Sequence, residues 1–269
     1  MATHAERRLA ARAARDSHRR RAWHGQPRLL RLGAVVAVVV LALVAVIMLS
    51  AGGSGRSTVV SPAAESSALT EVGTLLAGIP QAGMTLGRAN APITITEYSD
   101  LVCPACYDFA TTSERELISA EVATGHAKLV ARGLETASGI ANGGEYTASQ
   151  TAISAAGLQG RAWNYLLLAY AEQPQTIGGR SAEEVAYLTP AYLQNLAAQI
   201  PGLNLIKWQA DLTSPSLVKA VSADSRAAQA AGVQSTPSLT VSGPVQTVRI
   251  TGAPTLAQVR TAMRQAAGR

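Results

Sequence analysis

Apolar and polar side chains alternate in several short stretches of the chain, a pattern typical of half-buried β-strands. The clearest case is Ile93–Ser99, ITITEYS, and a second short strand is expected over Lys128–Leu134, KLVARGL. Near the end of the chain, Ser238–Ser242 and Val245–Thr251 flank a Gly243-Pro244 turn and predict a hairpin. We therefore expect a sheet built from strands that lie far apart in the sequence.

Helix-spaced apolar positions occupy the intervals between these strands. Tyr107–Val122 mixes apolar and charged residues at amphipathic spacing, and Thr255–Ala267 places its apolar residues on one face. Residues 146–231 show helix signals and few strand formers. The pattern predicts an α/β domain over residues 84–269 with a helical insertion at about 146–231. The large aromatic residues of the insertion are expected to pack in its core: Trp163, Trp208 and Tyr165.

The longest apolar run, Leu32–Leu49, contains 18 residues without a charge, about the minimum for a helix that crosses a bilayer. Nine arginines precede it, so the positive-inside rule predicts a cytoplasmic tail over residues 1–31 and a translocated remainder. A cleaved secretory signal is the alternative, although the run is long for a signal and no distinct cleavage site follows. Either interpretation places the domain outside the cytoplasm.

Residues 50–83 are expected to form a flexible tether between this transmembrane helix and the domain. The stretch from 50 to 67, SAGGSGRSTVVSPAAESS, is rich in Gly, Ser, Ala and Pro and lacks apolar periodicity. We therefore place the start of the folded domain near Met84.

The positive charge of the chain belongs to the tail. The formal net charge is +6, from 23 basic and 17 acidic side chains. Nine of the basic residues and two of the acidic ones lie in residues 1–31, so 14 basic and 15 acidic residues remain. A nearly neutral domain lacks the basic surface of a nucleic-acid-binding protein, and we expect no nucleic-acid partner.

The chain has two cysteines, Cys103 and Cys106, in the sequence CPAC between the first strand and the following helix. On a first helical turn, unpaired N–H groups and the helix dipole favour the thiolate of Cys103, and Pro104 suits the position because it lacks an N–H. Such a pair can cycle between dithiol and disulfide, with Cys103 in the mixed disulfide and Cys106 resolving it.

The sequence disfavours two other uses of the cysteine pair, a static disulfide and a metal site. A static disulfide would close a very short loop and so restrain little of the unfolded chain's entropy. A metal site is disfavoured because His126 is the sole histidine of the predicted domain. We therefore predict a redox role that needs no metal, nucleotide or flavin in this chain.

Glu97 follows Ile93 and Ile95 on one face of the first strand. If it is buried, its pKa is raised, and the carboxyl group could exchange a proton with Cys106 through water. The alternative is an ordinary exposed glutamate at a strand end.

Three separated stretches resemble the DsbA-like branch of the thioredoxin superfamily. GRANAP before ITITEYSDLVCPAC is similar to the entry strand and active-site turn, and Gly232–Ser238, GVQSTPS, resembles the GVxGTPx loop. Leu158–Gln173, LQGRAWNYLLLAYAEQ, resembles the QGxxWxxxxxLF helix of the insertion. The resemblance spans about Met84–Gly268 and implies a thioredoxin fold.

The resemblance also implies roles for individual residues. Cys103 matches the nucleophile, Cys106 the resolving thiol and Glu97 the buried acid, while Pro237 matches a cis-proline that faces the disulfide. The backbone of Ser235 and Thr236 would then pair with an extended substrate strand. Substrate contacts are expected around the active-site turn and the proline loop, namely at Pro104, Ala105, Ser235, Thr236 and Pro237.

The sequence departs from the family pattern in the dipeptide and in the proline loop. Strongly oxidising members often carry Pro-His where this chain has Pro104-Ala105, so one source of thiolate stabilisation is absent. Ser235 stands where Gly is common. These differences keep the reductase or isomerase direction open.

The expected function is an extracytoplasmic, membrane-tethered thiol-disulfide oxidoreductase acting on exported proteins with cysteines. The resemblance implies reoxidation by a DsbB-like or vitamin K epoxide reductase-like membrane protein. The alternatives are a disulfide reductase or isomerase of the same fold and a tethered peptide-binding or chaperone module without redox turnover. A single-pass scaffold whose arginines bind anionic lipid would explain the tail alone.

Overall fold

The computed structural model describes residues 67–142, 144–177, 179–181 and 184–269, all within one unit of the chain, Ala63–Arg269. The predictions of a basic tail, a transmembrane run and the first part of the tether fall outside these residues. None of the helices in the described part of the chain is long and apolar enough to cross a membrane.

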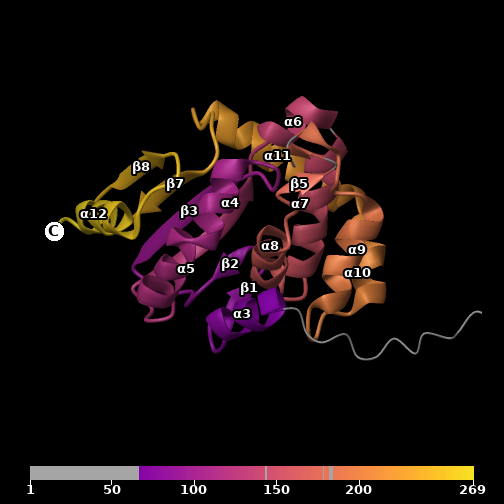
Figure 1. Cartoon of the computed structure of the whole chain (residues 1–269). Coiled ribbons are helices and arrows are strands. Elements are labelled where there is room, and N and C mark those ends of the chain that lie inside the picture. The colour runs from indigo at the N-terminus through magenta and orange to yellow at the C-terminus, as the bar shows by residue number, and fades with distance from the viewer. Residues whose placement is uncertain (1–66, 143, 178, 182–183) are drawn as a thin grey trace, which may run out of the picture. The chain divides into compact units, whose positions relative to one another are not determined.

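Six strands form a mixed sheet in the order β1-β2-β4-β3-β7-β8 (Figure 1). Their bounds are β1 (Gln81–Ala82), β2 (Thr85–Leu86), β3 (Ile93–Ser99), β4 (Ala127–Gly133), β7 (Ser238–Ser242) and β8 (Thr247–Thr251). The central strand β3 runs parallel to β4 and antiparallel to β7. The four strands expected from the alternation are confirmed: β3 and β7 have the predicted bounds, β4 begins and ends one residue earlier, and β8 begins two residues later.

Helices make up most of the remaining described chain. Their bounds are α3 (Ser67–Leu76), α4 (Pro104–Thr111), α5 (Ser113–Leu117), the π-helical turn η1 (Ile118–Val122), α6 (Ala137–Asn142), α7 (Gly144–Gly157), α8 (Ala162–Ala171), α9 (Pro190–Gln199), α10 (Leu205–Leu212), α11 (Pro215–Ala230) and α12 (Leu256–Ala266). The mixed α/β fold with a helical insertion is as predicted. Helices α6 to α11 lie between β4 and β7, and α6 precedes the predicted start of the insertion. The insertion also holds a small hairpin, β5 (Thr176–Ile177) and β6 (Arg180–Ser181).

The predicted tether is wrong in its last part, because residues 67–83 belong to the folded domain. Helix α3 buries Val72 (0% exposed) and Leu76 (5%) in the main core. The exposed side of α3 is joined to α5 by an ion pair between Glu71 and Arg115, with 3.2 Å between Nη2 and Oε2. The prediction failed because the few apolar residues of this helix stand among small and polar ones. The helix is stable because its apolar face packs on the core.

The single helix predicted over 107–122 is also corrected, because the structure breaks it into α4, α5 and η1. The backbone of Thr112 leaves the helical region, with φ −123° and ψ −97°. The hydroxyl groups of Thr111 and Thr112 donate to the carbonyl oxygens of Tyr107 and Asp108, four residues earlier. Such bonds compete with the helical ladder and often bend helices, which accounts for the break at this point.

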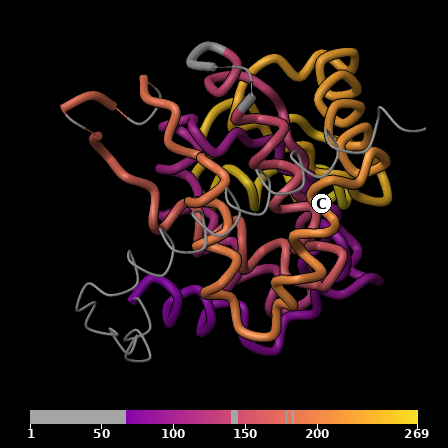
Figure 2. The backbone as a smooth tube through the Cα atoms, turned by 90° about the vertical axis from the view of Figure 1, so that its right-hand side faces the viewer, coloured from indigo at the N-terminus to yellow at the C-terminus, as the bar shows by residue number. Residues whose placement is uncertain are grey.

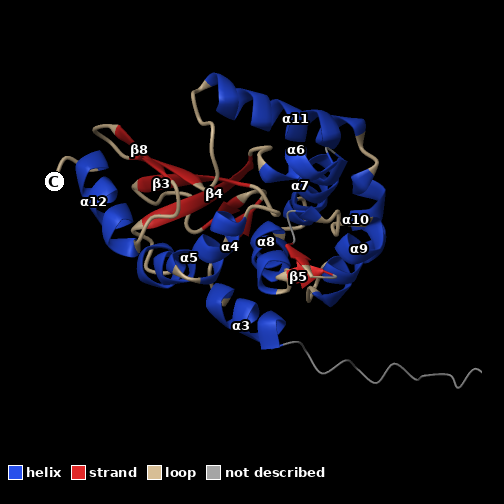
Figure 3. Cartoon of the chain, turned by 45° about the horizontal axis from the view of Figure 1, so that its top comes forward, coloured by secondary structure: helices blue, strands red, loops and turns tan. Residues whose placement is uncertain are grey.

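The helices cover both faces of the sheet (Figure 3). Along β3, residues 93, 95, 97 and 99 are buried on one face, toward α4, α5 and α12. The other face packs against α11, where Tyr98 contacts the cluster that contains Ala228. Arg132 of β4 and Asp224 of α11 form an ion pair of 2.8 Å on that same face.

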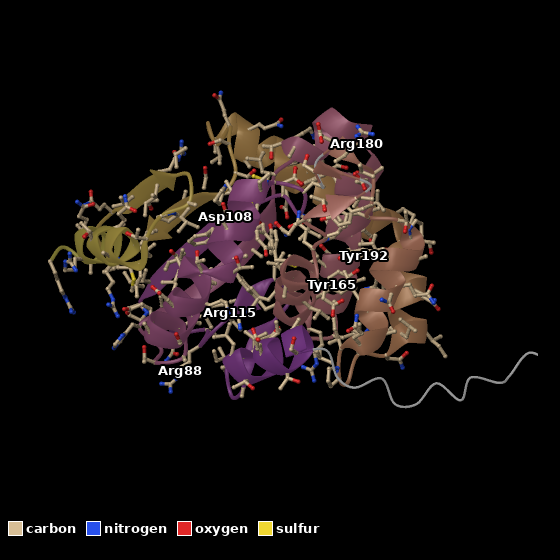
Figure 4. The ribbon with its side chains drawn as sticks, in the orientation of Figure 1. Arg88, Asp108, Arg115, Tyr165, Arg180 and Tyr192 are labelled. Atoms are coloured by element: carbon tan, nitrogen blue, oxygen red, sulfur yellow. The ribbon has the colours of Figure 1, made fainter. Side chains whose placement is uncertain are left out.

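The insertion packs as a helical layer of its own beside the sheet. Figure 2 shows α9 and α10, in orange, facing the viewer when the molecule is seen from this side. The predicted core residues are confirmed as buried: Trp163 and Tyr165 are 0% exposed and Trp208 is 1% exposed. Tyr165, labelled in Figure 4, stacks on Trp208 with ring centroids 6.0 Å apart. The Trp163 indole donates to the carbonyl oxygen of Met84 at 3.0 Å, which ties the insertion to the start of the sheet.

Candidate functional site

The two cysteines lie where β3 ends and α4 begins. Cys103 is the N-cap residue of α4 and Pro104 occupies the first helical turn, as the sequence predicted. The N–H groups of Cys106 and Tyr107 donate to the carbonyl oxygen of Cys103 at 3.0 and 3.1 Å. Both cysteines are free thiols, and Cys103 (8% exposed) reaches solvent more than Cys106 (1%). Cys103 is therefore the sulfur that an incoming protein could approach.

The surroundings of the two thiols shift their pKa values in opposite directions. The hydrogen bond from Cys106 is the main cause that lowers the pKa of Cys103 to about 6, against burial, which raises it. The side chain of Thr236 and the backbone N–H groups of Ala105 and Cys106 also stabilise the thiolate. Burial raises the pKa of Cys106 well above its usual value, and the neighbouring Cys103 raises it further. At neutral pH the site thus holds a Cys103 thiolate beside a Cys106 thiol.

The loop before β7 lies against Cys103. The Thr236-Pro237 bond is cis, as the resemblance implied. The Cys103 Sγ atom lies 3.4 Å from the carbonyl oxygen of Thr236. The structure therefore brings the proline loop and the active-site turn together, although 133 residues separate Cys103 from Thr236 in the chain.

The five residues predicted to contact substrate differ in exposure. Pro104 and Ser235 are exposed, Ala105 and Thr236 are half-buried, and Pro237 is buried. The carbonyl oxygen of Ser235 already accepts a hydrogen bond of 2.6 Å from the Ser238 hydroxyl. Ser235 thus has one backbone lone pair fewer to offer an extended strand than the sequence suggested.

Asp100, which the sequence analysis did not select, organises this site. Its carboxylate is buried (1% exposed) and accepts five hydrogen bonds. The donors are the backbone N–H groups of Val102, Thr136 and Ser138 and the hydroxyl groups of Thr136 and Ser138. An acid directly after a buried strand, three residues before Cys103, was the available signal.

Thr136 continues this network to the proline loop. Its hydroxyl oxygen lies 2.7 Å from that of Thr236, across 100 residues of chain. The Thr136 hydroxyl also lies 3.2 Å from the Asp100 carboxylate, so Thr136 links this carboxylate to the proline loop, and either threonine hydroxyl can donate across their contact. The carboxylate of Asp100 thereby fixes the Thr236 backbone beside Cys103.

The insertion supports the same turn from the other side. The Tyr170 hydroxyl donates to the carbonyl oxygen of Asp100 at 3.2 Å, and the Tyr187 hydroxyl donates to that of Leu101 at 3.3 Å. Both tyrosines are buried. The Asp100 carbonyl oxygen also accepts from the Cys103 N–H at 3.0 Å, so Tyr170 adds a second donor there, while Tyr187 provides a donor to Leu101.

Glu97 is buried, at 1% exposure, so the expectation of a carboxyl group inside the core is confirmed. Burial raises its pKa, while the neighbouring Glu114 carboxyl and the Ser99 hydroxyl lower it in part. The groups that act on Glu97 are therefore Glu114 and Ser99, and its exchange of a proton with Cys106 stays a prediction. Glu114 was missed, because it lay among charged residues in the helix predicted to be amphipathic.

A known protein family and solved structures are similar to this chain. A family model described as Thioredoxin matches residues 80–263. No curated protein sequence matches the chain. The fold is similar to that of oxidised BdbD from Bacillus subtilis, with a TM-score of 0.57 at 18% identity over 70% of this chain and 96% of that one.

Two DsbA structures are similar as well. DsbA2 of Pseudomonas aeruginosa has a TM-score of 0.51 at 22% identity, covering 71% of this chain and 97% of its own. DsbA of Chlamydia trachomatis has a TM-score of 0.52 at 23% identity, covering 68% of this chain and 90% of its own. At these identities, the likeness establishes a thioredoxin-like fold with a helical insertion.

Proposed function

The chain belongs to the thioredoxin family, and we propose that it is a protein thiol-disulfide oxidoreductase acting through Cys103 and Cys106. The observation that carries the proposal is the contrast between the two thiols at the start of α4. The accessible sulfur has its pKa lowered to about 6, and the buried one has its pKa raised. A nucleophile and a resolving thiol require this division.

The exchange proceeds by two displacements at sulfur. A substrate thiolate attacks Cys103 in the Cys103–Cys106 disulfide, and Cys106 leaves as a thiolate that then takes up a proton. A second substrate thiolate attacks the substrate sulfur of the mixed disulfide and releases Cys103 as a thiolate. The substrate has then lost two electrons to form its disulfide, and the enzyme has gained them as a dithiol.

The thiolate of Cys103 favours the oxidising direction. A group that stabilises the leaving thiolate stabilises the reduced enzyme, and a stable reduced form makes the disulfide a stronger oxidant. In this chain the Cys103 thiolate is stabilised by the Cys106 thiol, the Thr236 side chain and two backbone N–H groups. The histidine common between the two cysteines of strongly oxidising members is absent from Pro104-Ala105. Disulfide formation is therefore the direction we propose, with reduction or isomerisation as the alternative.

The sequence supports a location of the domain outside the cytoplasm. The uncharged run Leu32–Leu49 preceded by nine arginines supports a single-pass anchor that leaves the domain outside the cytoplasm. Exported proteins with cysteines are then the substrates. Reoxidation falls to a DsbB-like or vitamin K epoxide reductase-like membrane protein, as the family resemblance implies.

The proposal is tested by trapping and by equilibration with glutathione. Cys106→Ala should accumulate mixed disulfides with protein substrates, because no thiol is left to resolve them, and Cys103→Ala should trap none. An equilibrium that favours the dithiol form in a glutathione buffer supports the oxidising direction, whereas a strongly reducing potential supports the reductase. If Cys103→Ala retains full function, the chain acts as a binding module and the proposal is wrong.

A further inference from the structure

Two buried carboxyl groups, from β3 and α5, interact with each other in the core. Glu97 of β3 is 1% exposed, and Glu114 of α5 is 0% exposed. Each carboxyl group acts on the other as a hydrogen-bonding neighbour. No donor from another residue in the described part of the chain forms a hydrogen bond of standard geometry with any of their four oxygens. Apart from the Ser99 hydroxyl, which acts on Glu97, each carboxyl group has the other as its hydrogen-bonding neighbour.

Among the residues that the structure describes, no positive charge contributes to the pKa shifts of this pair. The strand neighbours of Glu97 in register are Ala131 of β4 and Leu239 of β7, both apolar. Arg115, which follows Glu114, pairs instead with Glu71 of α3. Helix α12 contributes Val259, Ala262 and Met263 to the core, while its Arg260 pairs with Glu121 at 2.7 Å.

The titratable groups near the pair belong to the redox site. Tyr170 of α8 lies close enough to both Glu97 and Cys106 of α4 for their charges to raise its pKa, after burial as the main cause. The Ser99 hydroxyl neighbours both Glu97 and Tyr170. Glu97 and the Cys106 sulfur thus act electrostatically on the same buried tyrosine.

Elementary electrostatics limits the charge that this pair can carry. Burying one unpaired carboxylate is costly, and burying two in contact adds their repulsion, so the pair retains at least one proton. Burial raises the pKa of both groups, and the Glu97 charge raises that of Glu114 further. The hydrogen bond from Glu114, by contrast, eases the ionisation of Glu97.

We propose that Glu114 is a positioning residue that shares a proton with Glu97, so that the pair can take up and return the proton of Cys106 without a buried cation. The inference rests on the proposed thiol-disulfide exchange and deepens it. When the mixed disulfide is resolved, the Cys106 thiol gives its proton to the singly ionised pair. Its sulfur then attacks the Cys103 sulfur, the new disulfide forms, and the substrate leaves as a thiolate with the electron pair of the broken bond.

The first test follows the carboxyl groups directly, by carbon NMR titration of glutamate in the reduced protein. In the wild type, Glu114 should titrate well above an exposed glutamate and together with Glu97. Glu114→Gln keeps a donor to Glu97, so the titration midpoint of Glu97 should stay within about half a pH unit of the wild-type midpoint. Glu114→Leu removes the donor, so the midpoint of Glu97 should rise by about one pH unit or more. Glu116→Gln, an exposed site on the same helix, is the matched control.

The second test measures how fast Cys106 resolves a mixed disulfide between Cys103 and glutathione, as a function of pH. Glu114→Leu should move the acidic limb of this profile to higher pH and slow resolution about tenfold on that limb, with Glu114→Gln close to the wild type. Rescue by glutamine separates a proton-sharing role from a merely structural one.

The outcomes of the two tests are separable. Wild-type Glu114 that titrates like an exposed glutamate would overturn the inference even if every variant misfolds, as would an unchanged pH profile in Glu114→Leu. If the wild type resolves no mixed disulfide at all while Glu97 and Glu114 titrate together, the oxidoreductase proposal fails and the shared proton stands.

Discussion

At the scale of single residues, the two sulfur atoms differ because they sit in different surroundings. Cys103 receives hydrogen bonds at the N-terminus of α4, where helical N–H groups lack partners, whereas Cys106 is enclosed one turn further on. The sequence predicted the N-terminal position, and so the sign of the Cys103 shift. It did not predict that the Cys106 thiol contributes most to that shift.

We expect Cys106→Ala to raise the pKa of Cys103 from about 6 toward the ordinary thiol value, because the largest stabilising hydrogen bond is lost. Iodoacetamide alkylation measured against pH reports this midpoint. In the reduced wild type, the folded pKa of Cys103 lies below the unfolded one. Its contribution to stability is therefore full above the unfolded pKa and is lost as the pH falls through about 6. A midpoint unchanged by Cys106→Ala would assign the shift to the helix terminus instead.

Asp100→Asn tests the five hydrogen bonds to one buried carboxylate. Asparagine offers a single acceptor oxygen and turns an N–H group toward donors, so we expect a loss of about 2–4 kcal/mol in the free energy of unfolding. Urea unfolding of the reduced protein measures it. Asp108→Asn on the exposed side of α4 is the control, with a change within about 0.5 kcal/mol (Figure 4). Equal effects of both variants would contradict the role assigned to Asp100.

At the scale of elements, helix α3 shows where local composition misleads. Its small and polar residues are typical of a linker. In the structure, however, Val72 and Leu76 belong to a core whose other residues come from distant parts of the chain. An isolated helix of 10 residues is marginal in water, so the packing rather than the propensity makes it stable.

Val72→Ala should therefore destabilise the protein by about 1–3 kcal/mol, from lost transfer energy and the cavity left in the core. Thr70→Ala, at an exposed position of the same helix, should change the free energy of unfolding little. Thermal or urea unfolding of both variants decides the matter. If Val72→Ala is as stable as the wild type, residues 67–76 do not contribute to the core, and the prediction of a tether would be correct for them.

At the scale of the whole molecule, the insertion is connected to the redox site through tyrosine hydroxyl groups. Tyr170→Phe leaves the carbonyl oxygen of Asp100 without this donor, and we expect a loss of about 1–2 kcal/mol and a changed rate of Cys103 alkylation. Tyr165→Phe is the matched control, because its hydroxyl bonds Leu193 within the insertion at 2.7 Å.

The expected result is similar destabilisation in the two tyrosine variants but altered thiol reactivity in Tyr170→Phe alone. Urea unfolding gives the first quantity and the pH profile of alkylation gives the second. If Tyr170→Phe leaves the alkylation profile as in the wild type, the insertion stabilises the domain without influencing the site.

Much of the fold and half of the site could be predicted because the relevant signals are local. Alternation over a few residues places β3 and β7, and the CPAC sequence after a strand places both cysteines on a helix terminus. Burial of Glu97 follows from its register with Ile93 and Ile95, which share its face of the strand.

The sequence by itself thus determined the strands, the insertion and the position of the two thiols, since each depends on neighbours within a few residues. Only the tertiary structure decided that Asp100 would bind Ser138, that Thr136 would meet Thr236 across 100 residues, and that Glu114 would face Glu97. Such contacts depend on how the sheet, α5 and the proline loop pack against each other. Local sequence patterns do not predict this packing, because it is driven by the burial of apolar side chains that come from distant segments of the chain.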